Sequence, residues 1–314
     1  VEIWVVISCL VTWMLLYFGS YKSLEKTLLV MVLFFSFMTM IIAIAMQSTD
    51  YQVSFAQVSS GLSFSFPSEY LPLALAVFGF TGISYGEIMA YTYWCLEKGY
   101  AENSGNNVEE TKHWIKTMQT DVWVTVFFIT LGTLPFFFLG AGVLYNIPEL
   151  QQALATSSFW DIDVISSLQN MFSLVLGGWA KWLFIILAFF VLFSTLLSGT
   201  AAFTRTISDY LISMGLVKEQ ANTRKKLIKL IAFLIPFLSG LFYFVLPNPF
   251  TLLLIAGIWA AMGLPIVNIG ALYLVNKLEP ELQPRFTTKF ILWASLVLQL
   301  SMAVLIIDDI LLAF

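Results

Sequence analysis

Long apolar stretches separated by short polar or charged connectors recur along the whole chain. Most of them reach the roughly 20 residues that a helix needs to cross the hydrocarbon core of a bilayer. Lipid offers the backbone no hydrogen-bond partner, and no stretch alternates as a barrel strand does, so helices are predicted. The pattern therefore predicts an all-α, multi-span membrane helical bundle. Its eight predicted spans lie at residues 3–18, 28–46, 71–96, 122–145, 174–203, 227–246, 250–275 and 290–314.

Composition agrees with a membrane protein. Hydrophobic residues make up 59% of the chain and charged residues only 11%, whereas soluble domains are roughly 25% charged. No second, soluble domain is visible, so residues 1–314 are predicted to be a single transmembrane domain embedded in a lipid bilayer. Cys9 and Cys95 both lie inside predicted spans, so no disulfide framework is indicated. We find no nucleotide-binding loop, no zinc-type cluster and no catalytic triad pattern, and we expect no enzyme, no cofactor and no nucleic-acid partner.

The placement of basic residues predicts the orientation of the spans. All of the 15 Lys and Arg residues except Lys181 fall in the first, third, fifth and seventh connectors. An excess of Lys and Arg marks cytoplasmic connectors, so those four are predicted to face the cytoplasm of a plasma or inner membrane. Eight spans with a cytoplasmic first connector place both chain ends outside. We therefore expect an odd number of further spans upstream of residue 1.

The third predicted span carries the strongest candidate for chemistry. Its centre reads FGFTGISYGE, residues 78–87, with glycines at positions 79, 82 and 86. Glycines weaken a helix, and interrupted helices expose backbone carbonyls at the midplane, where transporters bind substrates and ions. A carboxylate in the middle of a span is costly and usually functional. The donors predicted to form a hard-oxygen cation site are Glu87, Ser84, Tyr85 and the carbonyl of Gly82 or Ile83, with Gly79, Gly82 and Gly86 as the helix break.

Other readings of these features remain open. Glycines in membrane helices often only permit close packing, which would explain the glycines but not the neighbouring Glu87. The small-residue run at 194–202 is predicted to be a helix–helix interface, and Gly257, Gly263 and Pro265 are predicted to bend the seventh span. The only histidine, His113, lies in a cytoplasmic connector, which favours a solvated surface position over a membrane proton relay.

Five further motifs follow one another along the chain: GSYKSLEK at 19–26, EETKHW at 109–114 and on to 121, GGWAK at 177–181, STLLSGT at 194–200 and GLP at 263–265. In this order they resemble the Nramp (natural resistance-associated macrophage protein) family of divalent-metal transporters, which have the LeuT-like fold. The similarity covers nearly the whole chain and would make the visible spans the fourth to the eleventh, with three missing upstream.

The chain departs from the family pattern at the substrate site. Typical members carry a Met-Pro-His motif in the sixth helix, whereas the matching residues here, 84–87, read SYGE. The glutamine usual in the tenth helix is also absent, and Gly257 and Gly263 occupy nearby positions. The resemblance thus implies a divergent branch that transports a hard divalent cation by alternating access, with manganese, iron or magnesium as substrate classes and proton coupling left open.

Two other functions are compatible with the same spans. The first is a carrier of amino acids or other small solutes on the same fold, which would need helix N-termini directed at a carboxylate. The second is a non-transporting membrane scaffold or sensor, for which the polarity of the third span would be dispensable. The sequence gives no indication of the oligomeric state.

Overall fold

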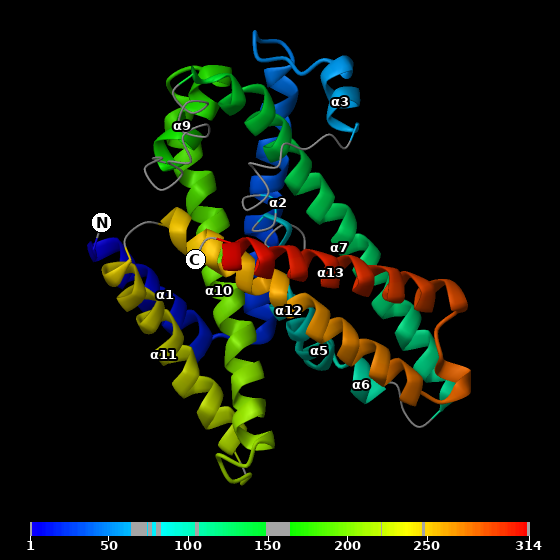
Figure 1. Ribbon diagram of the computed structural model, residues 1–314. Coiled ribbons are helices and arrows are strands. Elements are labelled where there is room, and N and C mark those ends of the chain that lie inside the picture. The colour runs from blue at the N-terminus through cyan, green and yellow to red at the C-terminus, as the bar shows by residue number, and fades with distance from the viewer. Residues whose placement is uncertain are drawn as a thin grey trace. The chain divides into compact units, whose positions relative to one another are not determined.

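The computed structural model describes residues 2–63, 74, 77–79, 83–103, 107–148, 164–220, 222–246 and 249–312. Within these residues the chain consists of helices and connecting turns, with no strand, as Figure 1 shows. This confirms the prediction of an all-α protein. The chain divides into two compact units, residues 1–65 with 123–248 and residues 66–122 with 249–314, and each is described by itself.

The first unit is built on long apolar helices. Helix α2 begins at Tyr21, where the side chain of Ser20 accepts a hydrogen bond from the backbone N–H of Ser23 at 3.3 Å. Ser is a favoured residue at this position because its oxygen satisfies one of the free N–H groups of the first turn. The helices of this unit are α1 (Glu2–Phe18), α2 (Tyr21–Met46), α3 (Phe55–Gly61), most of α7 (Val108–Gly142), the short η2 (Leu144–Asn146), α9 (Val164–Leu176), α10 (Ala180–Ser213) and α11 (Thr223–Val245).

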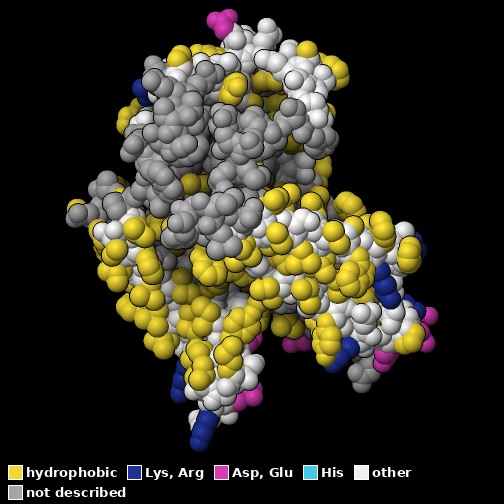
Figure 2. All heavy atoms as spheres, viewed as in Figure 1, with side chains coloured by type: hydrophobic (Ala, Val, Ile, Leu, Met, Phe, Trp, Pro, Cys, Tyr) yellow, Lys and Arg dark blue, Asp and Glu magenta, His cyan; other side chains and the backbone are white. Residues whose placement is uncertain are grey.

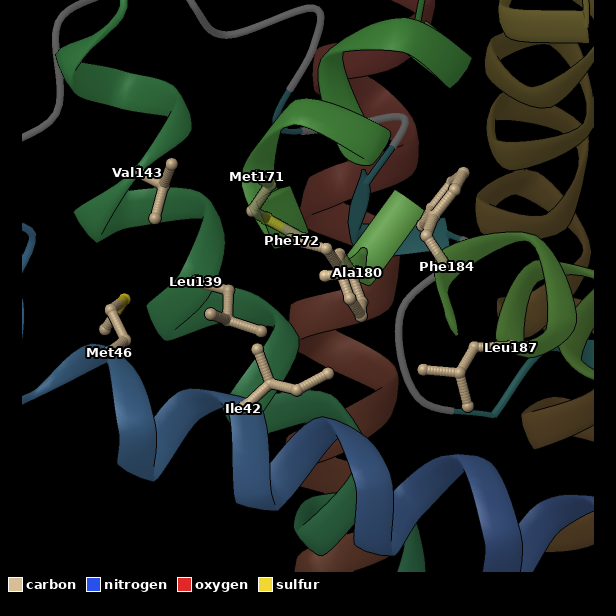
Figure 3. Packing of buried hydrophobic residues seen from close by; sticks show 9 residues of the cluster. All are labelled: Ile42, Met46, Leu139, Val143, Met171, Phe172, Ala180, Phe184 and Leu187. Atoms are coloured by element: carbon tan, nitrogen blue, oxygen red, sulfur yellow. The ribbon is translucent and has the colours of Figure 1, made fainter. Parts of the chain in front are cut away.

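A tightly packed core joins four of these segments. Its side chains come from α2, the end of α7, α9 and the start of α10, and they point toward one another in Figure 3. Gly142 permits the close approach of α7 to α2, because a Cβ there would lie 2.9 Å from the Met46 sulfur and 2.7 Å from the Tyr51 carbonyl oxygen. The buried members are Ile42, Met46, Leu139, Val143, Met171, Phe172, Ala180, Phe184 and Leu187.

Two glycines with positive φ set the ends of helices in this unit. Gly177 (φ 86°) follows α9, and its N–H donates to the Ser173 carbonyl at 2.9 Å. Gly215 (φ 72°) follows α10, where it donates to Ile212 while Leu216 donates to the carbonyl of Leu211. These are the left-handed caps at which glycine is favoured, because it has no Cβ to strain the backbone. Both helices therefore end where the local sequence requires them to.

The second unit contains the interrupted span and its packing partners. Residues 77–79 are helical, and they are followed, after residues outside the described part, by α5 (Tyr85–Glu97) and α6 (Tyr100–Asn103). The unit also contains α7 up to Val122, then α12 (Pro249–Lys277), the short η4 (Pro280–Leu282) and α13 (Phe286–Leu312). Helix α12 packs against both α5 and α13.

Six helices of the described residues are long and apolar enough to cross a membrane. They correspond to six of the eight predicted spans. The first predicted span is the 17-residue α1, and the third lies partly outside the described residues. Many apolar side chains of these helices are exposed, and Figure 2 shows them over much of the visible face. Such a surface suits lipid, which supports a multi-pass membrane protein.

Three predicted boundaries differ from the structure. The fourth span is part of α7, which starts at Val108, so most of the predicted charged connector is helical. The fifth span was predicted to start at residue 174, but the turn at Gly177 separates α9 from α10. Helix α9 in turn occupies the end of the predicted acidic loop. Residues 174–182 are mostly apolar, so the hydrophobic pattern did not indicate that turn.

Candidate cation site

The third predicted span is interrupted within the described residues. Phe78 and Gly79 lie in a helical turn, Ile83 and Ser84 do not, and α5 starts at Tyr85. Ser84 has φ −76° and ψ 164°, which is extended backbone. The N–H groups of the first helical turn have no partner inside a helix, so an interruption of this kind presents free polar backbone. Gly82, named as a carbonyl donor and as a break residue, lies outside the described residues.

Glu87 lies in the first turn of α5. Its Oε2 accepts a hydrogen bond from the backbone N–H of Ser84 at 2.7 Å. A Glu three residues after the N-cap commonly makes this bond, which satisfies a free donor and places negative charge at the positive end of the helix. The side chain is exposed, and no described residue makes a hydrogen bond or ion pair with its second oxygen. The carboxylate is thus anchored through one oxygen and open at the other.

Tyr85 rests against a glycine of α12. A Cβ placed at Gly263 would lie 2.5 Å from Cδ1 and 2.8 Å from Cγ of the Tyr85 ring. No larger residue would therefore permit the present ring position. The ring is half-buried, and its hydroxyl makes no hydrogen bond to any described residue. Gly263 positions the phenol beside the start of α5.

We expect Gly263→Ala to displace Tyr85 and to reduce transport. The added methyl group must push the ring aside, and overpacking of this kind costs about 1–3 kcal/mol. The measurement is metal uptake per folded transporter in proteoliposomes. Gly270→Ala, in the same helix, is the matched control because a Cβ there meets nothing within 4 Å. Equal uptake by the two variants would contradict a positioning role for Gly263.

Gly79 packs against the same helix before the interruption. A Cβ at Gly79 would overlap the Gly257 carbonyl oxygen and lie 2.6 Å from the backbone nitrogen of Ala261. Phe78 packs nearby against Ala261 of α12 and Ile306 of α13. Gly79 therefore lies at a contact where two helical backbones touch. Gly86, in contrast, lies in the first turn of α5, so Gly79 and Gly86 are both helical and flank the interruption.

Polar contacts hold the other end of α5. Lys98 Nζ donates to Asp121 Oδ2 at 2.7 Å, and the Tyr100 hydroxyl donates to the same oxygen at 3.1 Å. From the middle of α5, the Tyr91 hydroxyl donates to the carbonyl of Met118 in α7 at 3.2 Å. Burial, and then the hydrogen bond to Asp121, raise the pKa of Tyr100, so the phenol stays a neutral donor at physiological pH. These bonds tie the end of α5 to α7.

The contact shown between the predicted oxygen donors is the hydrogen bond from the Ser84 N–H to Glu87. In the described part of the chain, no three His, Cys, Asp or Glu side chains come together as a metal site. The available donors are therefore one carboxylate, from Glu87, with the hydroxyls of Ser84 and Tyr85 and backbone carbonyls. Hard oxygens of this kind suit magnesium, calcium or manganese. The assignment of these residues to cation binding stays a prediction.

The sequence analysis missed a buried polar contact between α12 and α13. The Nδ2 of Asn268 donates to Ser295 Oγ at 2.8 Å and to Gln299 Oε1 at 3.1 Å, and its Oδ1 is buried without a partner among the described residues. Ser295 and Gln299 are four residues apart and so share one face of α13. That spacing in an apolar span was the available signal. Polar contacts between membrane helices are often structural, and this one joins α12 to its neighbour.

Comparison with known proteins identifies a family. A family model described as "Natural resistance-associated macrophage protein-like" matches residues 1–308. No curated protein and no solved structure gives a significant match. The matched range covers both structural units and includes the interruption before α5.

Proposed function

We propose that this chain, which belongs to the Nramp family of divalent-metal transporters, moves a hard divalent cation past the interruption before α5. Members of this family are membrane transporters with a LeuT-like fold, and the resemblance noted in the sequence is confirmed. The transported ion is the substrate and not a resident cofactor. In the proposed site Glu87 supplies the charge, and Ser84, Tyr85 and the carbonyl of Gly82 or Ile83 supply neutral oxygens.

The observation that carries the proposal is the exposed carboxylate at a broken membrane helix. An ionised side chain at this depth is expensive unless it has a partner or a function. Glu87 uses one oxygen at the Ser84 amide, and its other oxygen is free to bind a cation. Alternating access then requires only that the site be reached from one side of the membrane at a time.

The proposed selectivity follows from the absence of a soft ligand in the motif. Residues 84–87 contain neither Met nor His, and soft thioether or imidazole ligands are what favour thiophilic transition metals. Manganese and magnesium are therefore the proposed substrates, and the plasma or inner membrane is the proposed location. Uptake that increases with an inward proton gradient would extend the proposal to proton coupling.

We expect hard competitors to inhibit manganese uptake more strongly than soft ones. In proteoliposomes with the full-length protein, excess magnesium should suppress uptake of radiolabelled manganese, and cadmium at equal concentration should do so about tenfold less, a difference of about 1.4 kcal/mol. Stronger inhibition by cadmium would contradict the hard-oxygen site. Isothermal titration with metals and with amino acids separates this proposal from a solute carrier. Only a solute carrier is expected to give a heat of binding when amino acids are added.

A further inference from the structure

The connection between α10 and α11 carries a concentration of positive charge. Six basic and only two acidic residues lie from Arg205 to Lys229, in a chain whose formal net charge is −4. Figure 2 shows Lys and Arg side chains at the end of this helical hairpin. The charge pattern places this end on the cytoplasmic side. The hairpin belongs entirely to the first unit, so its internal geometry is described.

An ion pair fixes the two helices of the hairpin to each other. Arg224 Nε donates to Asp209 Oδ1 at 2.7 Å, and its Nη2 donates to Oδ2 at 3.3 Å. A two-point contact between guanidinium and carboxylate sets the orientation as well as the distance. Arg205 in turn donates to the Ala201 carbonyl at 2.8 Å. The Arg205 bond lies within α10, so the Arg224–Asp209 pair is the contact that joins the two helices.

The lysines of the first turns of α11 are not neutralised by the fold. Lys225 and Lys226 are exposed and have no acidic partner in the described part of the chain. Lys229 is also exposed, and its Nζ lies 4.4 Å from the centre of the Tyr17 ring. Spacings of three and four residues place Lys229 on the same side of the helix as the other two.

Their position is unfavourable for an isolated helix. The N-terminus of a helix carries partial positive charge, so basic side chains are repelled there. Asn222, at the N-cap of α11, makes no side-chain hydrogen bond to the helix, and the first turn contains no acidic residue. An external anion beside these lysines would offset both the helix dipole and their mutual repulsion.

With α11 spanning a bilayer, the lysines would lie at the level of the lipid headgroups. The apolar part of α11 begins immediately after Lys229, and Lys225 is one turn, about 6 Å, farther from it. The polar headgroup zone has a thickness of this order. Beside Lys225 the hairpin is hollowed, with a volume of ≈ 410 Å³. The hollow is lined by Asp209, Ile212, Ser213, Glu219, Gln220, Asn222, Arg224 and Lys225.

We propose that Lys225, Lys226 and Lys229 bind the phosphate of an anionic membrane lipid in the cytoplasmic leaflet. The depth of the lysines favours a lipid over a soluble phosphate, because a lipid phosphate is held at this level by its acyl chains. Each basic residue near an anionic surface contributes about a fivefold preference. The fixed Asp209–Arg224 pair presents the three lysines on a rigid support. The bound lipid would stabilise the hairpin.

The test uses the full-length protein in mixed detergent micelles. Native mass spectrometry measures the fraction that retains phosphatidylglycerol when equal amounts of phosphatidylglycerol and phosphatidylcholine are offered. The variant replaces the three lysines together by Gln. The control replaces Lys22, Lys112 and Lys116 by Gln, which removes the same charge from other exposed positions predicted to be cytoplasmic. We expect preferential retention of phosphatidylglycerol by the wild type and the control, and at least a roughly tenfold lower preference in the hairpin variant.

Three results would overturn the proposal. They are the absence of a preference in the wild type, an equal loss of preference in the control, and displacement of the lipid by millimolar inorganic phosphate. An equal loss would mean that only total cytoplasmic charge matters, and displacement would indicate a site for a soluble anion. A midpoint of thermal unfolding measured on each variant in phosphatidylcholine alone shows that the hairpin variant is folded, so that a lost preference reports on the site.

Discussion

Glu87→Gln should lower metal uptake about tenfold or more. Removing even an indirect partner of a metal site typically costs 10–100-fold in metal affinity or activity, and this change removes the proposed negative ligand itself. Glutamine is nevertheless an accepted residue at this position of a helix start, because its amide oxygen can still accept from the Ser84 N–H. The substitution therefore separates charge from helix capping. Uptake of radiolabelled manganese or magnesium in proteoliposomes measures the effect.

The comparison with Glu87→Ala and Glu25→Gln completes this experiment. Glu87→Ala removes both the charge and the cap, so it should lose uptake and also some thermal stability, about 0.5–2 kcal/mol for a lost cap. Glu25 is an exposed carboxylate near the start of α2, in the first unit, and its replacement should leave uptake unchanged. Full uptake by Glu87→Gln with reduced stability of Glu87→Ala would show that Glu87 only caps α5.

Gly79→Ala should strongly reduce the amount of folded protein. The added Cβ meets backbone atoms of α12, at Gly257 and Ala261, which cannot turn aside as a side chain can. Overpacking against a side chain costs about 1–3 kcal/mol of folding free energy. Because this contact is with backbone, we expect a loss at the upper end of that range or above it. The midpoint of thermal unfolding and the yield of monodisperse protein in detergent both measure the loss.

The control for this variant is Gly270→Ala, which adds the same methyl group to α12 in open space. Alanine is the better helix former by about 1 kcal/mol, so the control should be as stable as the wild type or slightly more stable. A stable Gly79→Ala protein would mean that the two helices are not in contact at this point, and the account of the interruption as held by α12 would then fail.

The membrane spans could be predicted from the sequence, but not all of their ends. A run of apolar residues is sufficient to identify α2, α11, α12 and α13, since lipid requires each to be a helix. The ends depend on other forces. The polar first half of α7 is helical although it has no apolar pattern, and a left-handed turn at Gly177 divides what appeared to be a single span.

The candidate site could be predicted in part. Glycine spacing and a carboxylate in the middle of an apolar stretch were enough to draw attention to residues 78–87. The contact between Tyr85 and Gly263 could not be derived, because it depends on how α5 and α12 approach each other through space. The hydrogen bond from Ser84 to Glu87 was within reach of the sequence, since Ser followed three residues later by Glu is a helix-start pattern.

The hydrogen bond between Ser84 and Glu87 has a consequence for the release of the cation. The cation is proposed to bind the other oxygen of Glu87, and a cation that also drew Oε2 away would deprive the Ser84 amide of its acceptor, so part of the binding free energy would be spent on opening the helix start. By reciprocity, whatever tightens the first turn of α5 weakens the hold on the ion by the same factor. A carrier benefits from such a competitor at its own site, because an ion bound too tightly would not leave on the other side.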